Sequence, residues 1–464
     1  MLDNQRRKTM KEILENALKN TGKADYVEIR LEKKESTSIH FQGKKLEKID
    51  CSQQMGGSVR ALVKGGWSFV TFNQYDKLKE KVGQAINIAT LIGREKSRLA
   101  EVPPVVEVVK RELNKDFRQV SLKEKKELIE NYNNIILNYS PKIQSTNVIY
   151  GDSFSTVYFA NSEGSFIRHE KPNLIVSLTA IARDGDNVQM ANESLGTVKG
   201  FKKAEDISLR AEKAAFRAVN LLKAKPVEGG EYTVVLDQTL GGVFIHEAFG
   251  HLSEADFLYE DDRMKNLMKL GTKFGFKKLN VIDDGSISNL LGSSKYDDEG
   301  VKTKKNYLIR NGILTGRLHS RETAKKMNEM PTGNARALNY RFKPIVRMTN
   351  TYIENGKTSF ENLISGVKKG IYAKKFYGGN TTFEMFTFSA GEGFMIRDGK
   401  IAEPVKDVVL SGNLFTVLLN IESIGDDLKM IEAAGGCGKG GQAPLPVSFG
   451  SPHLRIKKVV VGGK

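Results

Sequence analysis

Two histidines and a glutamate lie close together in the segment Gly-Gly-Val-Phe-Ile-His-Glu-Ala-Phe-Gly-His at residues 241–251. This segment places His246, Glu247 and His251 within six consecutive positions. Two imidazoles can bind a zinc ion, and a neighbouring carboxylate can take a proton from the water that attacks a substrate. These residue types together indicate metal-assisted hydrolysis of the kind that metallopeptidases perform.

The spacing of the two histidines does not fit a regular α-helix. Zinc-binding histidines on a helix usually stand four positions apart, on one face, whereas His246 and His251 stand five apart. In a regular helix this spacing separates the two side chains by roughly 140°. Gly250, directly before His251, permits a bulge or an early helix end. We therefore expect a distorted helix at this point.

A catalytic zinc ion needs about three protein ligands and one open position, so a further ligand has to come from elsewhere in the chain. Cys437 is a candidate because glycines surround it in the segment 435–442, and Lys439 is placed to hold a thiolate. Cys51 has no ligand-like neighbours and is interpreted as an ordinary small residue. The residue types alone leave further candidates open: Glu254, Asp256, His40, His169, His319 and His453.

Composition and charge exclude several classes of protein. The 464 residues include 72 Lys and Arg against 55 Asp and Glu, which gives a formal net charge of +17. Basic residues are interleaved with acidic ones and form no block of five or more, so we interpret the charge as a solvated surface and expect no specific nucleic-acid partner. Two cysteines far apart in the chain exclude a disulfide-built secreted domain.

The hydrophobic segments indicate a cytoplasmic protein. Residues 1–20 are charged and lack the apolar stretch of a signal peptide. The longest mostly apolar stretch, residues 408–421, is interrupted by Ser411, Gly412 and Asn413 and is shorter than the ~20 apolar residues that span a bilayer. We therefore expect no membrane partner.

Hydrophobic periodicity predicts an α+β protein of three units. In residues 1–110 helical patterns flank strands that alternate apolar and polar residues, and the unit ends near Pro103-Pro104. Residues 111–228 repeat the pattern, with amphipathic helices on both sides of a region rich in β-branched residues. In residues 229–464 glycine clusters separate short strands. We expect this last unit to be β-rich, with mixed and antiparallel sheets, and to contain the site.

Further motifs follow the His-Glu segment in a fixed order along the chain. The chain resembles the TldD/PmbA family of zinc metallopeptidases, on the TldD side, over nearly its whole length. The motifs that carry the resemblance are residues 246–251 followed by Glu254-Ala255-Asp256-Phe257, Thr332-Gly333-Asn334-Ala335-Arg336, the run 344–351, Ser389-Ala390-Gly391-Glu392-Gly393, the run 437–442 and the run 451–456.

The resemblance implies a cofactor, a reaction and the residues that perform it. His246, His251 and Cys437 match the family's ligands for Zn²⁺, and Glu247 matches its catalytic glutamate. The implied activity is hydrolysis of unfolded or small peptides, with Glu247 taking the proton of the attacking water and passing it to the leaving amine. Glycine-punctuated strands near residues 378–393 predict that the substrate binds as an added strand.

The resemblance also implies a dimer, formed either with a PmbA/TldE-like paralogue that lacks the His-Glu-x-x-x-His motif or with a second copy of this chain. The alternative is a non-catalytic partner or scaffold subunit of such a complex, and the complete set of matching ligands argues against it. We further expect Tyr340, Arg347 and His453 to contact the substrate, where one of them would stabilise the developing oxyanion.

Overall fold

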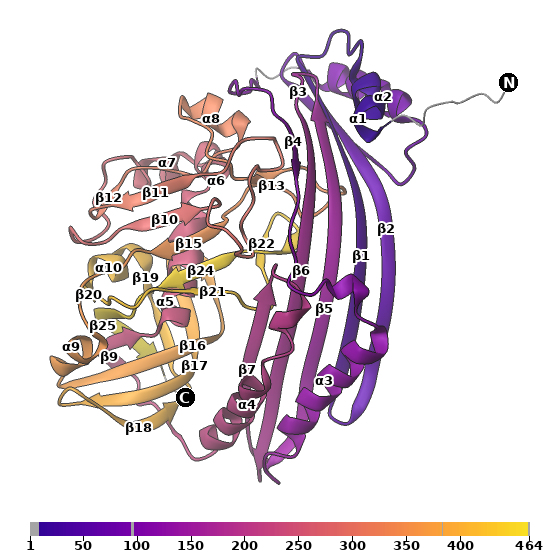
Figure 1. Cartoon of the computed structure of the whole chain (residues 1–464). Helices are drawn as coiled ribbons and strands as arrows, with labels where there is room; N and C mark the ends of the chain where they lie inside the picture. Colours follow the sequence, from indigo (N-terminus) through magenta and orange to yellow (C-terminus); the bar gives the residue numbers. More distant parts are fainter. Residues whose placement is uncertain (1–8, 94–96, 383, 463–464) are drawn as a thin grey trace.

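A long curved sheet and a β-rich C-terminal unit lie side by side in the molecule (Figure 1). The computed structural model describes residues 9–93, 97–382 and 384–462. The expected α+β class with a β-rich C-terminal region is confirmed. No helix in these ranges is both long enough and apolar enough to cross a membrane.

The long sheet contains seven strands from the first half of the chain. Its order is β3-β2-β1-β5-β6-β4, with β7 also paired to β6. Since β1 pairs antiparallel with β5, strands from both sides of residue 110 share one sheet, and the division of this half into units stays a prediction. The strands are β1 (Tyr26–Gln42), β2 (Lys45–Val63), β3 (Gly66–Phe72), β4 (Val106–Val109), β5 (Ile143–Asn161), β6 (Phe166–Asp184) and β7 (Asn187–Thr197).

Four helices cover the two ends of this sheet. Helices α1 (Met10–Leu18) and α2 (Leu78–Ile92) gather at one end, and α3 (Leu122–Leu137) and α4 (Ser208–Leu221) lie along the other (Figure 1). Each helix buries one apolar face against the sheet, as its amphipathic pattern predicts. Thr9 and Glu12 form a reciprocal capping box that fixes the start of α1.

The C-terminal unit is built on two larger sheets. One has the order β16-β9-β25-β19-β17-β18-β8, with β20 paired to β25, and the other has the order β12-β11-β10-β15-β24-β21. The first comprises β8 (Lys225–Pro226), β9 (Gly230–Leu236), β16 (Lys369–Thr382), β17 (Met385–Arg397), β18 (Lys400–Lys406), β19 (Val409–Asn413), β20 (Ile421–Ile424) and β25 (Leu454–Gly462). The second comprises β10 (Val281–Asp284), β11 (Lys305–Arg310), β12 (Ile313–Leu314), β15 (Asn350–Ile353), β21 (Lys429–Ile431) and β24 (Ser448–Ser451).

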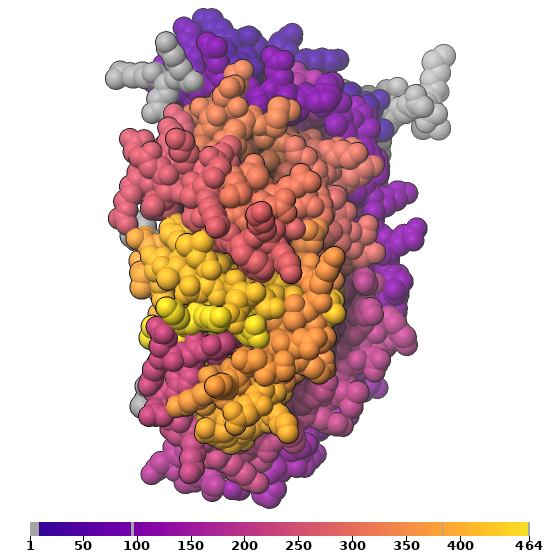
Figure 2. Space-filling model, turned by 90° about the vertical axis from the view of Figure 1, so that its left-hand side faces the viewer, coloured from indigo at the N-terminus to yellow at the C-terminus, as the bar shows by residue number. Residues whose placement is uncertain are grey.

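Two short hairpins and six helices complete this unit. Figure 2 shows the face on which the last strands, in yellow, cross the middle of the molecule between earlier segments of the same unit. The hairpins are β13 (Ala335–Arg336) with β14 (Ile345–Val346), and β22 (Cys437–Lys439) with β23 (Gln442–Leu445). The helices are α5 (Gln238–Ile245), α6 (Ala255–Glu260), α7 (Asp262–Leu267), α8 (Arg321–Met327), α9 (Phe360–Ser365) and α10 (Leu414–Leu419).

Buried ion pairs join the long sheet to the C-terminal unit. Arg60 of β2 contacts Glu28 at 2.9 Å and Glu299 of the C-terminal unit at 2.7 Å. Arg321 at the start of α8 contacts Glu163 at 2.7 Å and is fully buried. Removing one partner of the Arg60–Glu299 pair, in which both side chains are buried, would leave an uncompensated buried charge at a cost of about 3–5 kcal/mol. These contacts fix how the two parts of the molecule sit against each other.

A close contact between a glycine and a tyrosine lies at the same junction. A Cβ atom on Gly56 of β2 would come within 2.3 Å of the Tyr340 ring. That ring has little room to move, because it is buried and its hydroxyl donates to Asn73 Oδ1 at 2.8 Å. Only glycine fits opposite the tyrosine.

We predict that Gly56→Ala destabilises the protein by about 1–3 kcal/mol, because the new methyl group forces the Tyr340 ring out of place. The matched control is Gly83→Ala in the interior of α2, where a Cβ meets no atom within 4 Å. This change should stabilise by roughly 0.5–1 kcal/mol. Urea denaturation midpoints check both, and equal midpoints for the two variants would show that the junction is not tightly packed.

Candidate metal centre

A helix with one widened turn carries the two histidines of the His-Glu segment. Helix α5 starts at Asp237, whose side chain accepts a hydrogen bond from the Leu240 backbone. It continues into a π-helical turn, His246–Gly250, that is closed by a bond from the His251 amide to the His246 carbonyl. The wider turn absorbs one extra residue. As a result, the rings of His246 and His251 lie on the same side, with their centroids 5.5 Å apart.

The expected distortion of the helix is thus confirmed, but the reason for Gly250 is different from the one expected. Its backbone angles, φ −58° and ψ −49°, are those of an ordinary helix, so it supplies no special conformation. Its contribution is space, since a Cβ at this position would lie 2.0 Å from the sulfur of Met348. Gly250 allows the π-helical turn to pack against the strand region that precedes β15.

The hairpin of β22 and β23 brings Cys437 to the two histidines. Its Sγ lies 3.2 Å from His251 Nε2, although 186 residues separate the two in the sequence. One donor atom each of His246, His251 and Cys437 lies within 4.8 Å of the other two. Cys437 and His246 are both buried. The structure therefore places all three residues predicted to bind zinc around one point.

The charges around this point favour an ionised sulfur. Burial alone raises the pKa of the Cys437 thiol, but hydrogen bonds from His246 and His251 lower it to about 5. For His251, burial lowers the pKa of the imidazole, yet the Glu254 carboxylate and the Cys437 sulfur together raise it well above its ordinary value. Both shifts favour the charged forms of the two groups.

The donors at this point fit a zinc ion. Imidazole and thiolate are both donors that zinc accepts from proteins, and three such ligands leave a fourth position open. One donor atom of each of the three residues lies close enough to the other two to share one ion. The site thus has the three donors that a bound zinc ion would need.

Glu254 supports one of these histidines from behind. Its Oε2 accepts a hydrogen bond from His251 Nδ1 at 3.0 Å, while Nε2 of the same ring faces Cys437. This carboxylate fixes which nitrogen of His251 carries the proton and which one is free to bind a metal ion. Glu254 is fully buried. Glu254 was one of the acidic candidates for the third ligand. It lies on the side of the His251 ring away from Cys437, and it therefore positions a ligand.

Lys439 connects the two segments that carry the donors. Its ammonium group contacts Glu254 Oε2 at 3.0 Å and Asp256 Oδ1 at 2.6 Å, and it donates to the Val346 carbonyl at 2.9 Å. Lys439 and Cys437 belong to the same short strand, whereas Glu254 and Asp256 directly follow the His-Glu segment. The lysine thus ties the hairpin to the segment that carries the histidines.

Glu247 is the most accessible acidic group at this point. Its side chain is 37% exposed, and its Oε2 lies 3.9 Å from His251 Nε2. Its contact with His251 is long, and in contrast to Glu254 it does not pair with Lys439. The carboxylate is therefore exposed to water beside the donor atoms.

The three residues expected to contact the substrate have other partners in the structure. Arg347 is fully buried and donates to the carbonyls of Cys437 at 2.7 Å and Gln442 at 3.1 Å, so it holds the hairpin. Tyr340 packs at the junction with the long sheet. His453 bonds Asp427 at 2.5 Å and Tyr372 at 2.8 Å. Their contact with a substrate stays a prediction.

The remaining histidine candidates for the third ligand also lie elsewhere. His40 contacts Asn147 on the long sheet, at 3.1 Å. His319 contacts Glu329 at 3.1 Å. His169 is buried on β6, where burial lowers the pKa of its imidazole to about 3. None of these three shares a metal-binding group with His246 or His251 in the described ranges.

Comparison with known proteins identifies one family over most of the chain. Profiles described as PmbA/TldA metallopeptidase domain 1, central domain and C-terminal domain match residues 27–89, 115–222 and 229–463. The chain belongs to the PmbA/TldD metallopeptidase family. A metalloprotease of Synechocystis is 48% identical over 95% of this chain and 96% of its own length.

More distant members of the PmbA/TldD family match over similar lengths. A zinc metalloprotease TldD homologue of Saccharolobus solfataricus is 32% identical over 88% of this chain and 90% of its own. Among solved structures, TldE of Thermococcus kodakarensis superposes with a TM-score of 0.78 at 19% identity, covering 97% of this chain and all of the other. A Thermotoga maritima protein gives a TM-score of 0.79 at 20% identity, covering 98% and 100%. These structures show the shared fold.

Sequence reasoning missed how Glu254, Asp256 and Lys439 cooperate. The first two were considered as possible ligands, and Lys439 as a group that holds the thiolate. The available signal was their position, because each lies within five residues of a predicted ligand. In this member of the PmbA/TldD family Lys439 forms ion pairs with both Glu254 and Asp256. The sequence does not show how the hairpin aligns with the segment after His251, so these pairs could not be predicted.

We predict that Lys439→Met weakens metal binding by about tenfold to a hundredfold, because the hairpin loses its tie and Glu254 no longer holds His251 firmly. Lys439→Arg should recover part of the affinity. Titration with Co²⁺, followed by absorbance, measures it. Lys429→Met, at an exposed position on β21, removes the same charge and should change nothing. Equal affinities for Lys439→Met and Lys429→Met would contradict the positioning role.

Proposed function

We propose that this chain is a zinc-dependent peptidase that hydrolyses peptide bonds of unfolded or small peptides. The observation that carries the proposal is the convergence of His246, His251 and Cys437 within 4.8 Å beside the accessible carboxylate of Glu247. The naming of a Saccharolobus solfataricus relative as a zinc metalloprotease supports zinc as the metal.

In this proposal the protein groups divide the work. A zinc ion held by His246, His251 and Cys437 would supply Lewis acidity toward water and the scissile carbonyl. Glu247 accepts the proton of the attacking water and delivers it to the leaving amine. Glu254 keeps the Nδ1 proton of His251 in place, so that Nε2 stays directed at the metal position.

The open edge of β16 supports binding of an extended peptide. β16 pairs with β9 only at residues 370–373, whereas residues 376–382 pair with β17 on one side. On the other side, this stretch has no strand partner within the described ranges. β16 also contacts the π-helical turn that carries the histidines. We therefore propose that a substrate adds to this edge as a strand, with affinity from main-chain hydrogen bonds and little sequence preference.

The quaternary state and the location belong to the same proposal. We propose a dimer, either with a PmbA/TldE-like paralogue or with a second copy of this chain, in the cytoplasm. Co-purification from the native extract distinguishes the two dimers. The alternative, a non-catalytic scaffold subunit, lacks a specific observation in its favour, since the donor atoms and Glu247 are all in place.

We predict that Glu247→Gln abolishes hydrolysis of an unfolded peptide while leaving metal content unchanged. The amide keeps the size of the side chain but cannot accept the proton of water. A loss of about 10²–10⁴-fold in rate is expected for a proton carrier. Peptide cleavage, followed by mass spectrometry, and metal analysis measure the two effects. Activity close to that of the unchanged protein would exclude the general-base role.

We predict that Cys437→Ser sharply weakens zinc binding, because the hydroxyl is a poorer ligand than the thiolate whose pKa the two histidines lower. The Co²⁺-substituted protein should also lose its thiolate-to-metal charge-transfer band. Cys51→Ser is the matched control, since Cys51 is exposed on the long sheet. If affinity persists in Cys437→Ser and is lost instead in Glu254→Gln, the third ligand is Glu254.

A further inference from the structure

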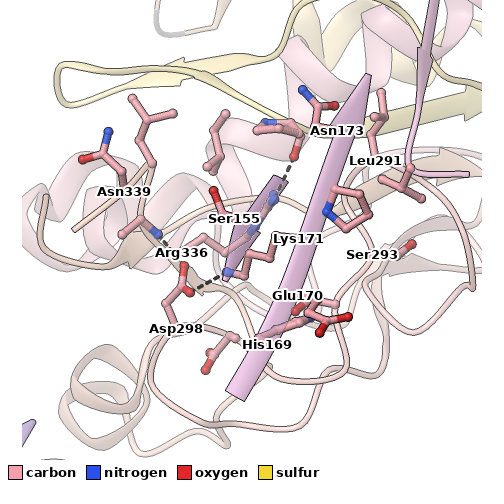
Figure 3. Close-up of a pocket in the computed structure, with 18 of the residues that line it drawn as sticks. Ser155, His169, Glu170, Lys171, Asn173, Leu291, Ser293, Asp298, Arg336 and Asn339 are labelled. Atoms are coloured by element: carbon pink, nitrogen blue, oxygen red, sulfur yellow. Dashed lines mark hydrogen bonds and ion pairs between the residues drawn. The ribbon is translucent and has the colours of Figure 1, made fainter. Parts of the chain in front are cut away.

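A polar cavity lies at the junction between the long sheet and the C-terminal unit. Its volume is about 360 Å³. Residues of β1, β5 and β6 line one side, and loops of the C-terminal unit around residues 291–303, 333–339 and 444–446 line the other. Figure 3 shows Lys171 on β6 reaching toward Asp298, with Arg336 close by; His169 and Glu170 of the same strand also line the cavity. A volume of this size lies at the lower end of the range for small-molecule pockets.

Charged side chains of both signs line the cavity. Five cationic groups face four carboxylates. The cations are Arg30, Lys34, Arg111, Lys171 and Arg336, and the carboxylates are those of Glu32, Glu170, Asp297 and Asp298. Whether the cavity favours an anion or a cation depends on which of these charged groups already have partners of opposite charge.

The carboxylates of the cavity are already engaged. Asp298 accepts from Lys171 at 2.8 Å and contacts Arg30 at 3.3 Å. Asp297 accepts backbone N–H bonds from Glu299 and Val301 of its own loop and from Ala335 of β13. Glu170 contacts the guanidinium of Arg168 at 3.0 Å. The oxygens of these groups therefore have little capacity left for further cations.

Two guanidinium groups of the cavity, in contrast, lack anionic partners. Arg336 donates to two backbone carbonyls, at 2.6 and 2.7 Å, and Arg111 donates to one at 3.0 Å. Within the described ranges no carboxylate lies within ion-pair distance of either. Arg30 differs from them, because it contacts Asp298 at 3.3 Å and Glu32 at 3.6 Å. Guanidinium nitrogens of Arg111 and Arg336 thus remain available around one enclosed space.

Burial disfavours the charged forms of the two arginines that lack anionic partners. It lowers the pKa of Arg336 to about 10, and it also lowers the pKa of Arg111. An anion beside these guanidinium groups would favour their charged forms again.

We propose that this cavity binds a small oxyanion, a phosphate or carboxylate group, between Arg111 and Arg336. Guanidinium groups present planar pairs of donors that match the oxygens of such anions. The anion would contact both parts of the fold at once, because Arg111 lies just after β4 of the long sheet and Arg336 belongs to β13 of the C-terminal unit. Its binding would therefore stabilise the junction. The proposal is independent of the metal chemistry, since no predicted zinc ligand lines the cavity.

Calorimetric titration of the full-length protein with inorganic phosphate, and separately with acetate, tests the proposal at constant ionic strength set with chloride. We expect saturable binding of at least one of the two anions and a rise in melting temperature with its concentration. Phosphate binding alone identifies a phosphate site, and acetate binding alone identifies a carboxylate site. Absence of saturable binding of both anions in the millimolar range would overturn the proposal.

Variants localise the binding. Arg111→Gln and Arg336→Gln should each weaken binding about tenfold or more, because a charge-assisted hydrogen bond is lost. Lys110→Gln removes the same charge at the exposed neighbouring position and should bind as the unchanged protein does. His246→Ala should also retain binding, which excludes a metal-bound anion. If Arg336→Gln fails to fold, Arg111→Gln still decides. Equal loss in Lys110→Gln, or loss only in His246→Ala, would contradict the assignment.

Discussion

The contact between the hairpin β22–β23 and the segment that follows His251 is the constraint on which the candidate metal centre depends. The thiol and the two imidazoles come from parts of the chain that are far apart in sequence. Lys439 holds these parts together by ion pairs, because its ammonium group is nearly buried between Glu254 and Asp256, which follow His251. Arg347 holds the same hairpin through its carbonyl groups. The position of the sulfur is therefore set by two buried cations as well as by strand pairing.

The long sheet contributes to this centre indirectly, since none of its described residues belongs to the metal-binding group. Arg60, which also pairs with Glu28, forms an ion pair with Glu299 of the C-terminal unit. Gly56 leaves space for the Tyr340 ring. Leu338 donates its backbone N–H to the Gln442 side chain, so the loop that contains Tyr340 also touches the hairpin that carries Cys437. The junction and the metal centre are thus connected through a few polar contacts in one loop.

The sequence predicted those parts of the site whose residues lie close together along the chain. His246, Glu247 and His251 stand together, and their spacing of five required the widened turn that the structure shows. The alternation of residues in β1, β5 and β6 likewise predicted strands. Periodicity did not show that these strands continue one sheet across residue 110, because pairing between distant strands leaves no trace in local pattern.

The partners of buried polar residues were the least predictable. Arg347 and His453 are predicted to contact the substrate, and the structure adds partners that the sequence did not indicate: Arg347 supports a hairpin, and His453 bonds Asp427 and Tyr372. Residue type gives the chemistry that a side chain can perform, whereas its partner depends on the register of segments far apart in sequence. Cys437 was placed by resemblance to a family, since the residue types left several ligands open.

The separation of the donors along the chain has a consequence for biosynthesis. The ribosome makes His246, Glu247 and His251 long before Cys437, and 186 residues separate the last of these histidines from the cysteine. A nascent chain that already contains the His-Glu segment therefore lacks one of the three proposed donors and the lysine that ties the hairpin in place. The order of synthesis itself delays assembly of the three donors until nearly the whole chain has been made, because Cys437 lies close to the end of the 464 residues.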